Sequence, residues 1–530
     1  MKVGIWVSSQ LTLEKWQVEA IRNIGTQNFE ITEVFALKDD TRKRNVKFGN
    51  ILYYLILGSQ RKLVRLASSI KITKVKEIQT LRVTWLDYES KGNWYSVKTS
   101  NIKSMSKLDV IVKFDGSLLR NPEEFEIPYG VISFHHGNPE KFRGRPAIFW
   151  ELFSGSQEIG MVVQQICSKL DSGKVLSFAN IKLNNYSYRQ NIKNLYKIST
   201  FMLSSALNNL EIQKQIPMTT NQKLYRLPNN SITLQVILKL LINKLRHILN
   251  VLFLQKVWWI AKVQLPILDK PIAVISRKEI VKIEGPEGSF FVADPMADPD
   301  GLIYAEVVNP PLFRGSIYVL KSGSWTRLEG KNSTSRHYSY PQVVLSNEKK
   351  FIFAETAYHS PPYLMQLSDS GEEVKSVHFL KGLGKERIAD GTLFPYQGNW
   401  YLFGSARKSN YSVLHLWVSE SLDREFEEHT SSPISFDVTS QRMAGPITEI
   451  NSVLFRFGQD CSSRYGSCIN VSRIEKLTRS EYQETKCGQI SIEEGFGPHT
   501  LSVLGDTAFI DGYEEHWNLA AILRKILARI

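Results

Sequence analysis

A change of residue pattern near position 270 constrains the fold more than any other feature of this chain. Before it, strand-like apolar runs alternate with segments whose apolar residues recur at helical spacing. After it, short strand-like runs follow one another, separated by turns rich in Gly, Asn and Asp. The 530 residues are also too many for one core, because a domain usually holds about 100–200 residues. We therefore expect domains of two structural classes, α/β and all-β.

The first part predicts a Rossmann-like parallel α/β sheet. Residues Lys2–Ser8 and Phe29–Leu37 have the character of buried strands, and Leu11–Ile24 between them has a helical period. A strand–helix–strand order is typical of parallel sheets. Two further strands are expected at Leu108–Phe114 and Tyr129–Phe134. Polar residues that follow such strands are functional candidates, since ligands bind at the carboxyl ends of parallel strands.

The last part predicts a five-bladed β-propeller. An acidic and aromatic strand, a turn and a second aromatic strand recur about every 45–60 residues between 271 and 513, close to the period of a propeller blade. Five such repeats fill the range, which indicates a propeller at 265–513. Residues 1–190 would then form the α/β domain, 191–264 a helical linker, and 514–530 a C-terminal amphipathic helix.

The predicted linker is basic and lacks acidic residues in its central part. Ser231–Val263 has apolar residues at helical spacing, no Asp or Glu, and a Trp258–Trp259 pair near its end. Such a helix either lies in the interface of an anionic membrane or packs as a long helix between two domains. A second basic segment, 40–75, forms either a solvated helical face or a contact to phosphate or lipid headgroups. Its basic residues include Arg42, Lys43, Arg44, Lys47, Arg61, Lys62 and Arg65.

Composition narrows the classes of function. The net charge of +14 suits nucleic acid, anionic lipid or a phosphorylated substrate, but no zinc-finger or RNA-binding signature is present, so no nucleic acid partner is expected. The four cysteines are too few for a disulfide framework, and no metal site is expected. The N-terminus lacks the pattern of a signal peptide. We expect a cytoplasmic protein, with a peripheral position at the inner face of the membrane as the alternative.

The stretch Ser133–Leu176 holds the densest group of chemically useful side chains. A His135–His136 pair ends a predicted strand, Arg143 and Gly144 form a turn, and Asp171 begins an Asp-Ser-Gly turn after a further helix and strand. The stretch resembles the active-site region of N10-formyltetrahydrofolate-dependent formyltransferases. That family carries Asn-x-His-x-Ser-Leu-Leu-Pro-x-Tyr-Arg-Gly and then Asp-x-Gly-x-Asp-x-Gly. The resemblance covers residues 1–190.

The resemblance implies transfer of a formyl group to an amine. His135 matches the catalytic histidine, and a histidine suits the task of taking a proton from the attacking amine near neutral pH. Asp171 matches the catalytic aspartate, which fixes the tautomer of the histidine. The implied cofactor is N10-formyltetrahydrofolate. Its implied binding residues are Arg143 and Gly144 in the turn, and Asp115 and Gly116 after the preceding strand.

The sequence departs from the family at a residue that the chemistry uses. Ser133 stands where the family has asparagine, and Gly137–Glu140 replaces Ser-Leu-Leu-Pro. Loss of one donor to the developing oxyanion typically lowers the rate about 10²–10³-fold. Ser133, His136 or Asn138 would have to supply that donor. Three outcomes stay open: a working formyltransferase with a rearranged site, a relative with another transfer or hydrolysis reaction, and a domain that only binds ligand.

Charged and polar residues recur at strand ends in the β-rich part, within the segments FVADP, FAET, IADG, RMAGP, FGQDC, GPHT and FIDG. They are Asp294, Glu355, Asp390, Arg442, Gln459, Asp460, His499 and Asp511. These segments resemble the five-bladed propeller found N-terminally in glucosamine inositolphosphorylceramide transferases and, more distantly, five-bladed glycoside hydrolases. The resemblance implies that the side chains line one funnel, where paired carboxylates can act on a sugar and Arg442 and His499 can hold an anionic group. Alternatively, the aspartates only cap turns.

One main hypothesis and two alternatives follow. The α/β domain would transfer a formyl group from N10-formyltetrahydrofolate to a nucleotide- or lipid-linked amino sugar in surface-glycan biosynthesis, while the propeller recognises the glycan. In the first alternative the propeller is a glycosidase or glycosyltransferase and the α/β domain is inactive or repurposed. In the second the protein is a non-catalytic glycan-binding scaffold.

Overall fold

The structure is a computed structural model that describes residues 1–24, 29–38, 46–92, 94–218, 222–264, 272–328, 337–356, 361–409 and 411–527. The chain divides into two compact units, Met1–Leu245 and Arg246–Ile530. The boundary lies inside helix α5 (Asn230–Phe253), well beyond the predicted domain edge at residue 190.

The first unit is built on a seven-stranded sheet of order β13-β12-β10-β8-β1-β3-β5. The strands β10, β8, β1, β3 and β5 run parallel, and β12 and β13 are antiparallel to their neighbours. The predicted parallel α/β sheet is therefore confirmed, with an antiparallel pair added at one edge. Its strands are β1 (Lys2–Trp6), β3 (Glu30–Leu37), β5 (Val83–Leu86), β8 (Val110–Lys113), β10 (Val131–His135), β12 (Glu158–Gln165) and β13 (Lys174–Lys182).

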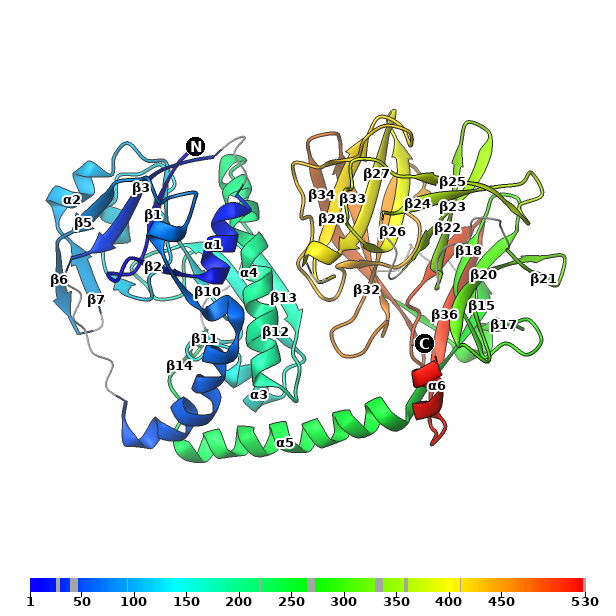
Figure 1. Ribbon diagram of the computed structural model, residues 1–530, viewed down its shortest axis with the longest axis horizontal. Helices are drawn as coiled ribbons and strands as arrows, with labels where there is room; N and C mark the ends of the chain where they lie inside the picture. Colours follow the sequence, from blue (N-terminus) through cyan, green and yellow to red (C-terminus); the bar gives the residue numbers. More distant parts are fainter. Residues whose placement is uncertain are drawn as a thin grey trace. The chain divides into compact units, whose positions relative to one another are not determined.

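Both faces of this sheet are covered, which explains why its central strands are almost wholly apolar. Helices α1 (Lys15–Arg22) and α4 (Tyr188–Glu211) contact each other on one face, and α4 also packs on β12 and β13 (Figure 1). A buried cluster that includes Trp6, Phe35 and Tyr95 covers the other face. Helix α4 was predicted to be part of a linker, but its long buried face makes it part of the first unit.

The basic segment after β3 is helical from residue 48 to residue 63, where 3₁₀, α and π turns follow one another without a break. Short turns and one strand that pairs with β2 follow up to residue 74, and Arg42, Lys43 and Arg44 lie outside the described residues. The elements concerned are β2 (Thr12–Glu14), η1 (Phe48–Asn50), η2 (Tyr53–Gly58), η3 (Arg61–Leu63), η4 (Arg65–Ala67), β4 (Ser69–Lys71) and η5 (Ile72–Lys74). The remaining elements of the unit are β6 (Tyr88–Lys91), β7 (Trp94–Val97), α2 (Thr99–Ser104), β9 (Leu118–Leu119), η6 (Pro122–Glu124), β11 (Arg143–Gly144), α3 (Phe149–Ser154) and β14 (Leu224–Tyr225).

The second unit is all-β apart from short helices, as its alternating turn-rich sequence predicts. Its described residues form five sheets, numbered here in chain order. The first has β18 (Phe291–Ala297), β19 (Ile303–Asn309), β20 (Arg314–Lys321) and β21 (Ser324–Arg327). The second has β22 (Ser339–Ser346), β23 (Lys349–Glu355), β24 (Tyr363–Leu367) and β25 (Val374–Phe379). The third has β26 (Ile388–Tyr396), β27 (Asn399–Ala406), β28 (Leu414–Ser419) and β29 (Glu427–Glu428).

The last two sheets combine strands that are distant in the sequence. The fourth has β30 (Arg442–Met443), β31 (Thr448–Ile450), β32 (Val453–Gln459), β33 (Ile469–Leu477), β34 (Tyr482–Ile492) and β16 (Ile272–Ile275). The fifth has β15 (Leu254–Gln264), β17 (Val281–Ile283), β35 (Leu501–Leu504) and β36 (Thr507–Trp517). Short helices η7 (Arg277–Glu279), η8 (Arg407–Ser409) and α6 (Ala521–Leu527) complete the unit.

The helix predicted over Ser231–Val263 ends at Phe253, and the residues after it form strand β15. This strand pairs antiparallel with β36 along its whole length, from Leu254 opposite Trp517 to Gln264 opposite Thr507. The prediction was wrong because an apolar strand directly follows an apolar helix, so the two periods merge in the sequence. The predicted C-terminal helix likewise begins later than residue 517, since Trp517 ends β36.

Hydrogen bonds link the five sheets in cyclic order. Asp511 of the fifth sheet accepts from the Asp294 amide of the first at 3.2 Å, and Asp294 accepts from the Tyr340 amide of the second at 2.9 Å. Glu355 of the second sheet accepts from the Asp390 amide of the third at 3.0 Å. The third and fourth sheets are joined by Ser405 Oγ to Gln441 O at 3.0 Å, and the fourth and fifth by Leu501 N to Ala444 O at 2.7 Å. The sheets therefore form a closed ring.

Among the residues described, no helix has both the length and the apolar character needed to cross a membrane.

Strand β15 should be a core element of the second unit. Ile260 in this strand is fully buried and packs with Val292, Ala305 and Val307 of the first sheet. Ile260→Ala should lower the free energy of unfolding by about 2–5 kcal/mol, as measured by urea denaturation. Lys262→Ala, at an exposed position of the same strand, is the control and should leave stability nearly unchanged. Equal stabilities for the two variants would contradict the assignment.

Candidate functional site

The first candidate site lies where β10 ends. His135 is the last residue of this strand, and its Nδ1 atom lies 3.2 Å from Asp171 Oδ1 in the turn between β12 and β13. Both side chains are largely buried. A carboxylate at Nδ1 favours the tautomer with its proton on Nδ1, which leaves Nε2 to take a proton. The structure thus brings together the histidine and the aspartate that the sequence indicates.

The backbone fixes both members of the pair. Asp171 has a positive φ of 48°, and its Oδ2 accepts a hydrogen bond from the Gly144 amide at 3.0 Å. Gly144 also has a positive φ, of 94°, and a Cβ atom there would clash with the Tyr225 carbonyl. A Cβ atom at Gly137 would lie 2.7 Å from His135 Nε2. The two glycines therefore make room for the histidine and aspartate.

Two of the predicted oxyanion donors, Ser133 and His136, form hydrogen bonds to other residues of the first unit. The Ser133 hydroxyl donates to the Lys113 carbonyl at 3.0 Å, so its proton is directed into the sheet. His136 Nε2 lies 3.0 Å from Ser199 Oγ, and its ring packs against Trp16 and Tyr196. Burial, followed by the neighbouring charge of His135, lowers the pKa of His136 to about 3, so this ring is neutral at physiological pH. His136 is a packing residue of the face that α1 and α4 cover.

Asn138 is the best placed of the three predicted donors. It is buried beside β12, where a Cβ atom on Gly160 would lie 2.5 Å from the Asn138 Cβ atom. The Asn138 Oδ1 atom accepts from the Glu140 amide at 2.9 Å, which orients the side chain with its nitrogen as donor. Asn138 follows His135 by three residues, whereas the family's asparagine precedes the histidine, and the bond from Asn138 Oδ1 to the amide two residues later also forms a turn.

The residues predicted to bind the cofactor have structural partners instead. Arg143 donates to the carbonyl oxygens of Leu170 and Gln222 at 2.5 and 3.2 Å, which ties its turn to the turn of Asp171. Asp115 forms an ion pair with the buried ammonium of Lys113. Gly144 donates to Asp171, and Gly116 is exposed in the loop after β8. Arg143 and Gly144 thus hold the two turns beside the His135–Asp171 pair together.

The second candidate site is a buried charge cluster in the second unit. His499 lies between two carboxylates, with Nδ1 2.6 Å from Asp511 Oδ2 and Nε2 3.2 Å from Asp294 Oδ1. Burial alone would lower the pKa of His499, but the charges of Asp511 and Asp294 outweigh it and raise the pKa. The Trp258 ring packs against the imidazole at a tilt of 41°, with ring centroids 4.3 Å apart. His499 therefore bridges the two aspartates.

These three side chains have ligand atoms within 4.8 Å of one another, a spacing that a metal ion can bridge. As they stand they are satisfied by one another and by neighbours. Thr500 donates its hydroxyl proton to Asp294 at 2.8 Å, and Asp511 accepts from the His499 and Thr500 amides at 2.9 and 3.0 Å.

A repeated backbone irregularity places the carboxylates. The first strands of the first three sheets each have a register shift, and the residue at each shift has a positive φ: 54° at Asp294, 51° at Tyr340 and 49° at Asp390. A non-glycine residue in this region costs about 1–3 kcal/mol, and such residues cluster at functional sites. The bulge turns each amide toward the carboxylate of the preceding sheet, as the ring of hydrogen bonds requires.

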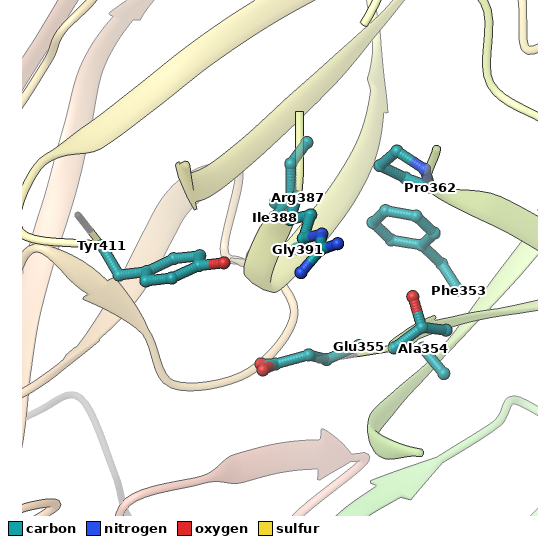
Figure 2. A pocket seen from close by; sticks show the side chains of 9 residues that line it. Phe353, Ala354, Glu355, Pro362, Arg387, Ile388, Gly391 and Tyr411 are labelled. Carbon is teal, nitrogen blue, oxygen red and sulfur yellow. The ribbon is translucent and has the colours of Figure 1, made fainter. Parts of the chain in front are cut away.

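Glu355 is the member of the cluster that lines a recess, and Asp390 is buried next to it. Arg442 donates from Nε to Asp390 Oδ2 at 2.5 Å. The pKa of Glu355 is raised to about 7, first by burial and then by the charge of Asp390. Glu355 lines a small recess between the second and third sheets, together with Arg387 and Tyr411. In Figure 2 the Glu355 carboxylate and the Tyr411 hydroxyl both point into this recess.

Sequence reasoning missed Glu306, a buried carboxyl on β19. Burial, with the charges of Asp294 and Glu355, raises its pKa well above the usual range. Gly315 leaves the space for it, since a Cβ atom there would clash with Glu306 Oε1. The signal was present, because Glu306 stands inside an otherwise apolar run of a strand.

Asp460 was predicted to line the funnel but caps its own loop. Its Oδ1 accepts from the amide and the hydroxyl of Ser462 at 2.9 and 2.6 Å. An aspartate that binds the backbone two residues later is a turn former. Gln459 likewise donates to the Met443 carbonyl at 2.8 Å. Both side chains are therefore hydrogen-bonded to groups of their own loop or sheet.

Comparison with known proteins finds relatives for both units. Residues 270–496 match the family model described as glucosamine inositolphosphorylceramide transferase 1, N-terminal. The chain is 29% identical over 233 residues to glucosamine inositolphosphorylceramide transferase 1 of Oryza sativa subsp. japonica, covering 40% of this chain and 30% of that protein. It is 32% identical over 117 residues to methionyl-tRNA formyltransferase of Wolbachia sp. subsp. Drosophila simulans (strain wRi), covering 22% of this chain and 38% of that protein.

The chain joins a formyltransferase-like unit to a domain that resembles the N-terminal domain of these plant transferases. It spans less than two fifths of the length of either relative. A solved N-formyltransferase of Helicobacter canadensis, in complex with folinic acid and dTDP-3-aminofucose, is similar at a TM-score of 0.29 and 10% identity, covering 45% of this chain and 80% of its own.

The raised pKa of Glu355 makes the stability of the second unit depend on pH. A glutamate in water has a pKa of 4.5, and the folded protein raises the pKa of Glu355 to about 7. Between these values only the folded state keeps the proton, so the stability that this group contributes is full below pH 4.5 and lost as the pH rises through about 7. The amide of Glu355→Gln does not titrate. The variant should therefore gain about 3 kcal/mol relative to wild type between pH 4.5 and pH 8, measured by urea unfolding.

Glu348→Gln, at an exposed position beside the same strand, is the matched control. The free energy of unfolding could depend on pH in the same way for wild type, Glu348→Gln and Glu355→Gln. That result would show that Glu355 titrates as an exposed carboxyl does.

Proposed function

We propose that the first unit transfers a formyl group from N10-formyltetrahydrofolate to the amine of an amino sugar during glycan biosynthesis. The observation that carries the proposal is the His135–Asp171 pair, with 3.2 Å between Nδ1 and Oδ1 at the end of a parallel strand. The similarity to formyltransferases supports the reaction class. N10-formyltetrahydrofolate enters as the formyl donor, a substrate that is consumed.

His135 and Asp171 have different roles in the reaction. The amine nitrogen attacks the formyl carbon, and a carbon–nitrogen bond forms. His135 Nε2 takes the proton that the amine loses, while Asp171 at Nδ1 stabilises the imidazolium. In this form the Nε2 proton points toward the Phe142 carbonyl, 3.4 Å away. The proton then passes to N10 of the folate as the old carbon–nitrogen bond breaks, which returns His135 to its neutral state.

Asn138 is the donor that we assign to the developing oxyanion in place of the family asparagine. Its amide nitrogen is held in a buried setting, where a hydrogen bond to a charged oxygen is stronger than in water. Ser133 stays a structural residue because its hydroxyl bonds to Lys113.

The sugar acceptor follows from the second unit. Its relative in rice is, by name, a glucosamine inositolphosphorylceramide transferase. We propose that the five sheets are the blades of a propeller and that the recess at Glu355 recognises the glycan. A nucleotide- or lipid-linked amino sugar would then be the acceptor.

Substitution of the base should abolish transfer with little effect on binding. His135→Asn should lower kcat about 10²–10⁴-fold, because a positioned general base contributes that much. The assay follows the release of tetrahydrofolate by absorbance and the formamide product by mass spectrometry, with a panel of amino sugars. Glu348→Gln, an exposed substitution in the other unit, is the control and should keep full formyl transfer. A His135→Asn protein as active as wild type would overturn the proposal.

Asn138 has its own test. Asn138→Ala should lower kcat about 10²–10³-fold with KM for the amino sugar nearly constant, as expected for a donor that acts in the transition state. Ser133→Ala should have a much smaller effect on kcat. The reverse order of the two effects would assign the oxyanion donor to Ser133.

A second candidate function is glycoside hydrolysis in the second unit. The observation in its favour is the difference between two neighbouring carboxyls: the pKa of Glu355 is raised to about 7, whereas Asp390 is paired with Arg442. Such a pair can supply one acid and one base. Under this hypothesis Glu355→Gln abolishes hydrolysis of aryl glycosides and His135→Asn has no effect. No hydrolysis by any variant, together with wild-type glycan binding, would leave the recess a recognition site.

A further inference from the structure

Helix α5 contacts the rest of the first unit through a mixed face, on which Val236 is fully buried and polar side chains make further contacts. Lys239 Nζ donates to the Phe153 carbonyl at 2.7 Å, and Asn243 Nδ2 donates to the Asn185 carbonyl at 3.1 Å. Lys244 lies over the Tyr186 ring, 5.3 Å from its centroid. A helix of a globular protein usually buries most of its apolar residues. In α5 only part of them is buried, with Val236 covered and a second group of leucines left exposed.

The second group of apolar residues on α5 is exposed. The residues of the first unit that form it are Leu234, Leu238, Leu241, Ile242 and Leu245, each at least half exposed. Their spacing of four, seven, eight and eleven residues from Leu234 places them in one stripe along the helix. A leucine stripe of this length in water is unfavourable and marks an interaction surface.

A second segment adds apolar residues beside the start of α5. Asn230 donates from Nδ2 to the Phe48 carbonyl at 3.1 Å, and its Oδ1 accepts from the Leu52 amide at 3.1 Å. Asn50 donates to the Pro228 carbonyl at 2.7 Å. The turns η1 and η2 therefore lie against the first turn of α5 (Figure 1). The exposed apolar residues of this segment are Phe48 (84% exposed), Leu55, Ile56 and Leu63.

The charge of both segments has one sign. Residues 41–75 and 212–268 contain no Asp or Glu. Exposed cations flank the apolar residues, among them Lys47, Lys62 and Arg65. A second copy of this surface would place like charges against each other, whereas an anionic bilayer offers opposite charge and hydrocarbon together.

We propose that α5 and residues 46–65 form one lipid-binding surface that seats the first unit on an anionic membrane. The leucine stripe would enter the boundary between headgroups and acyl chains, while the lysines and arginines contact lipid phosphates. The proposal is independent of formyl transfer, because none of these residues belongs to the His135 site. It implies that this unit can act on substrates held at a membrane surface.

The test is flotation of the full-length protein with vesicles. The protein should bind vesicles of phosphatidylglycerol mixed with phosphatidylcholine at low salt and should not bind vesicles of phosphatidylcholine alone. High salt should release much of it, because the attraction of exposed charges is screened. A triple variant, Leu238→Gln with Leu241→Gln and Leu245→Gln, should bind the anionic vesicles at least about a hundredfold more weakly.

A charge variant tests the electrostatic part of membrane binding and leaves the leucine stripe of α5 unchanged. Lys47→Glu with Lys62→Glu should weaken binding at least about tenfold, since each cation near the surface contributes about 1 kcal/mol. The matched controls are Lys91→Glu, exposed elsewhere in the first unit, and Leu312→Gln, exposed in the second unit. Both controls should bind as wild type does, and all variants should keep the wild-type circular dichroism spectrum.

Three results would overturn the proposal. The first is a wild-type protein that ignores anionic vesicles at low salt. The second is a triple leucine variant that binds them as tightly as wild type. The third is a wild-type dimer that the leucine variant converts to a monomer, with no vesicle binding by either, which would make the stripe a contact between two copies of the chain.

Discussion

The need to compensate carboxylates buried at strand ends governs both units of this protein. A buried carboxylate is costly unless a cation or N–H group is directed at it. In the first unit Asp171 is held by the Gly144 amide and His135. In the second unit backbone amides of one sheet hold carboxylates of the preceding one, and the side chains of Arg442 and His499 pair with carboxylates. The same contacts that keep the strand ends together thus prepare two sites for chemistry.

The predicted elements that proved correct are those with one clear period. The strands β1, β3, β8 and β10 are apolar runs bounded by polar residues, and their parallel order was confirmed. Strand β15 was not predicted because its pairing partner β36 lies about 250 residues away in the sequence and its period merges with that of α5. Pairing between strands this far apart in the chain has no local signal in a single sequence.

The candidate site was predictable in its residue types but not in their orientation. His135 and Asp171 were found from their spacing and their place after a strand and in a turn, and the structure puts them in contact. The roles of Ser133 and His136 depend on neighbours from β8 and from α4, which the sequence places far away. Successive side chains of a strand point to opposite faces of the sheet. The sequence therefore does predict that His135 and His136 point to opposite faces. Glu306 was detectable as an acid in an apolar strand, but its membership of the cluster required the closed ring of sheets.

Transfer of the formyl carbon is the central claim, and an isotope measurement tests it most directly. The purified protein is mixed with N10-formyltetrahydrofolate that carries ¹³C in its formyl group and with nucleotide- and lipid-linked amino sugars, and the label is followed by NMR. We expect a ¹³C formamide signal to appear on an amino sugar, at a rate that the protein concentration sets. A label that stays on the folate with every amino sugar, while the folate binds the protein, would contradict the account.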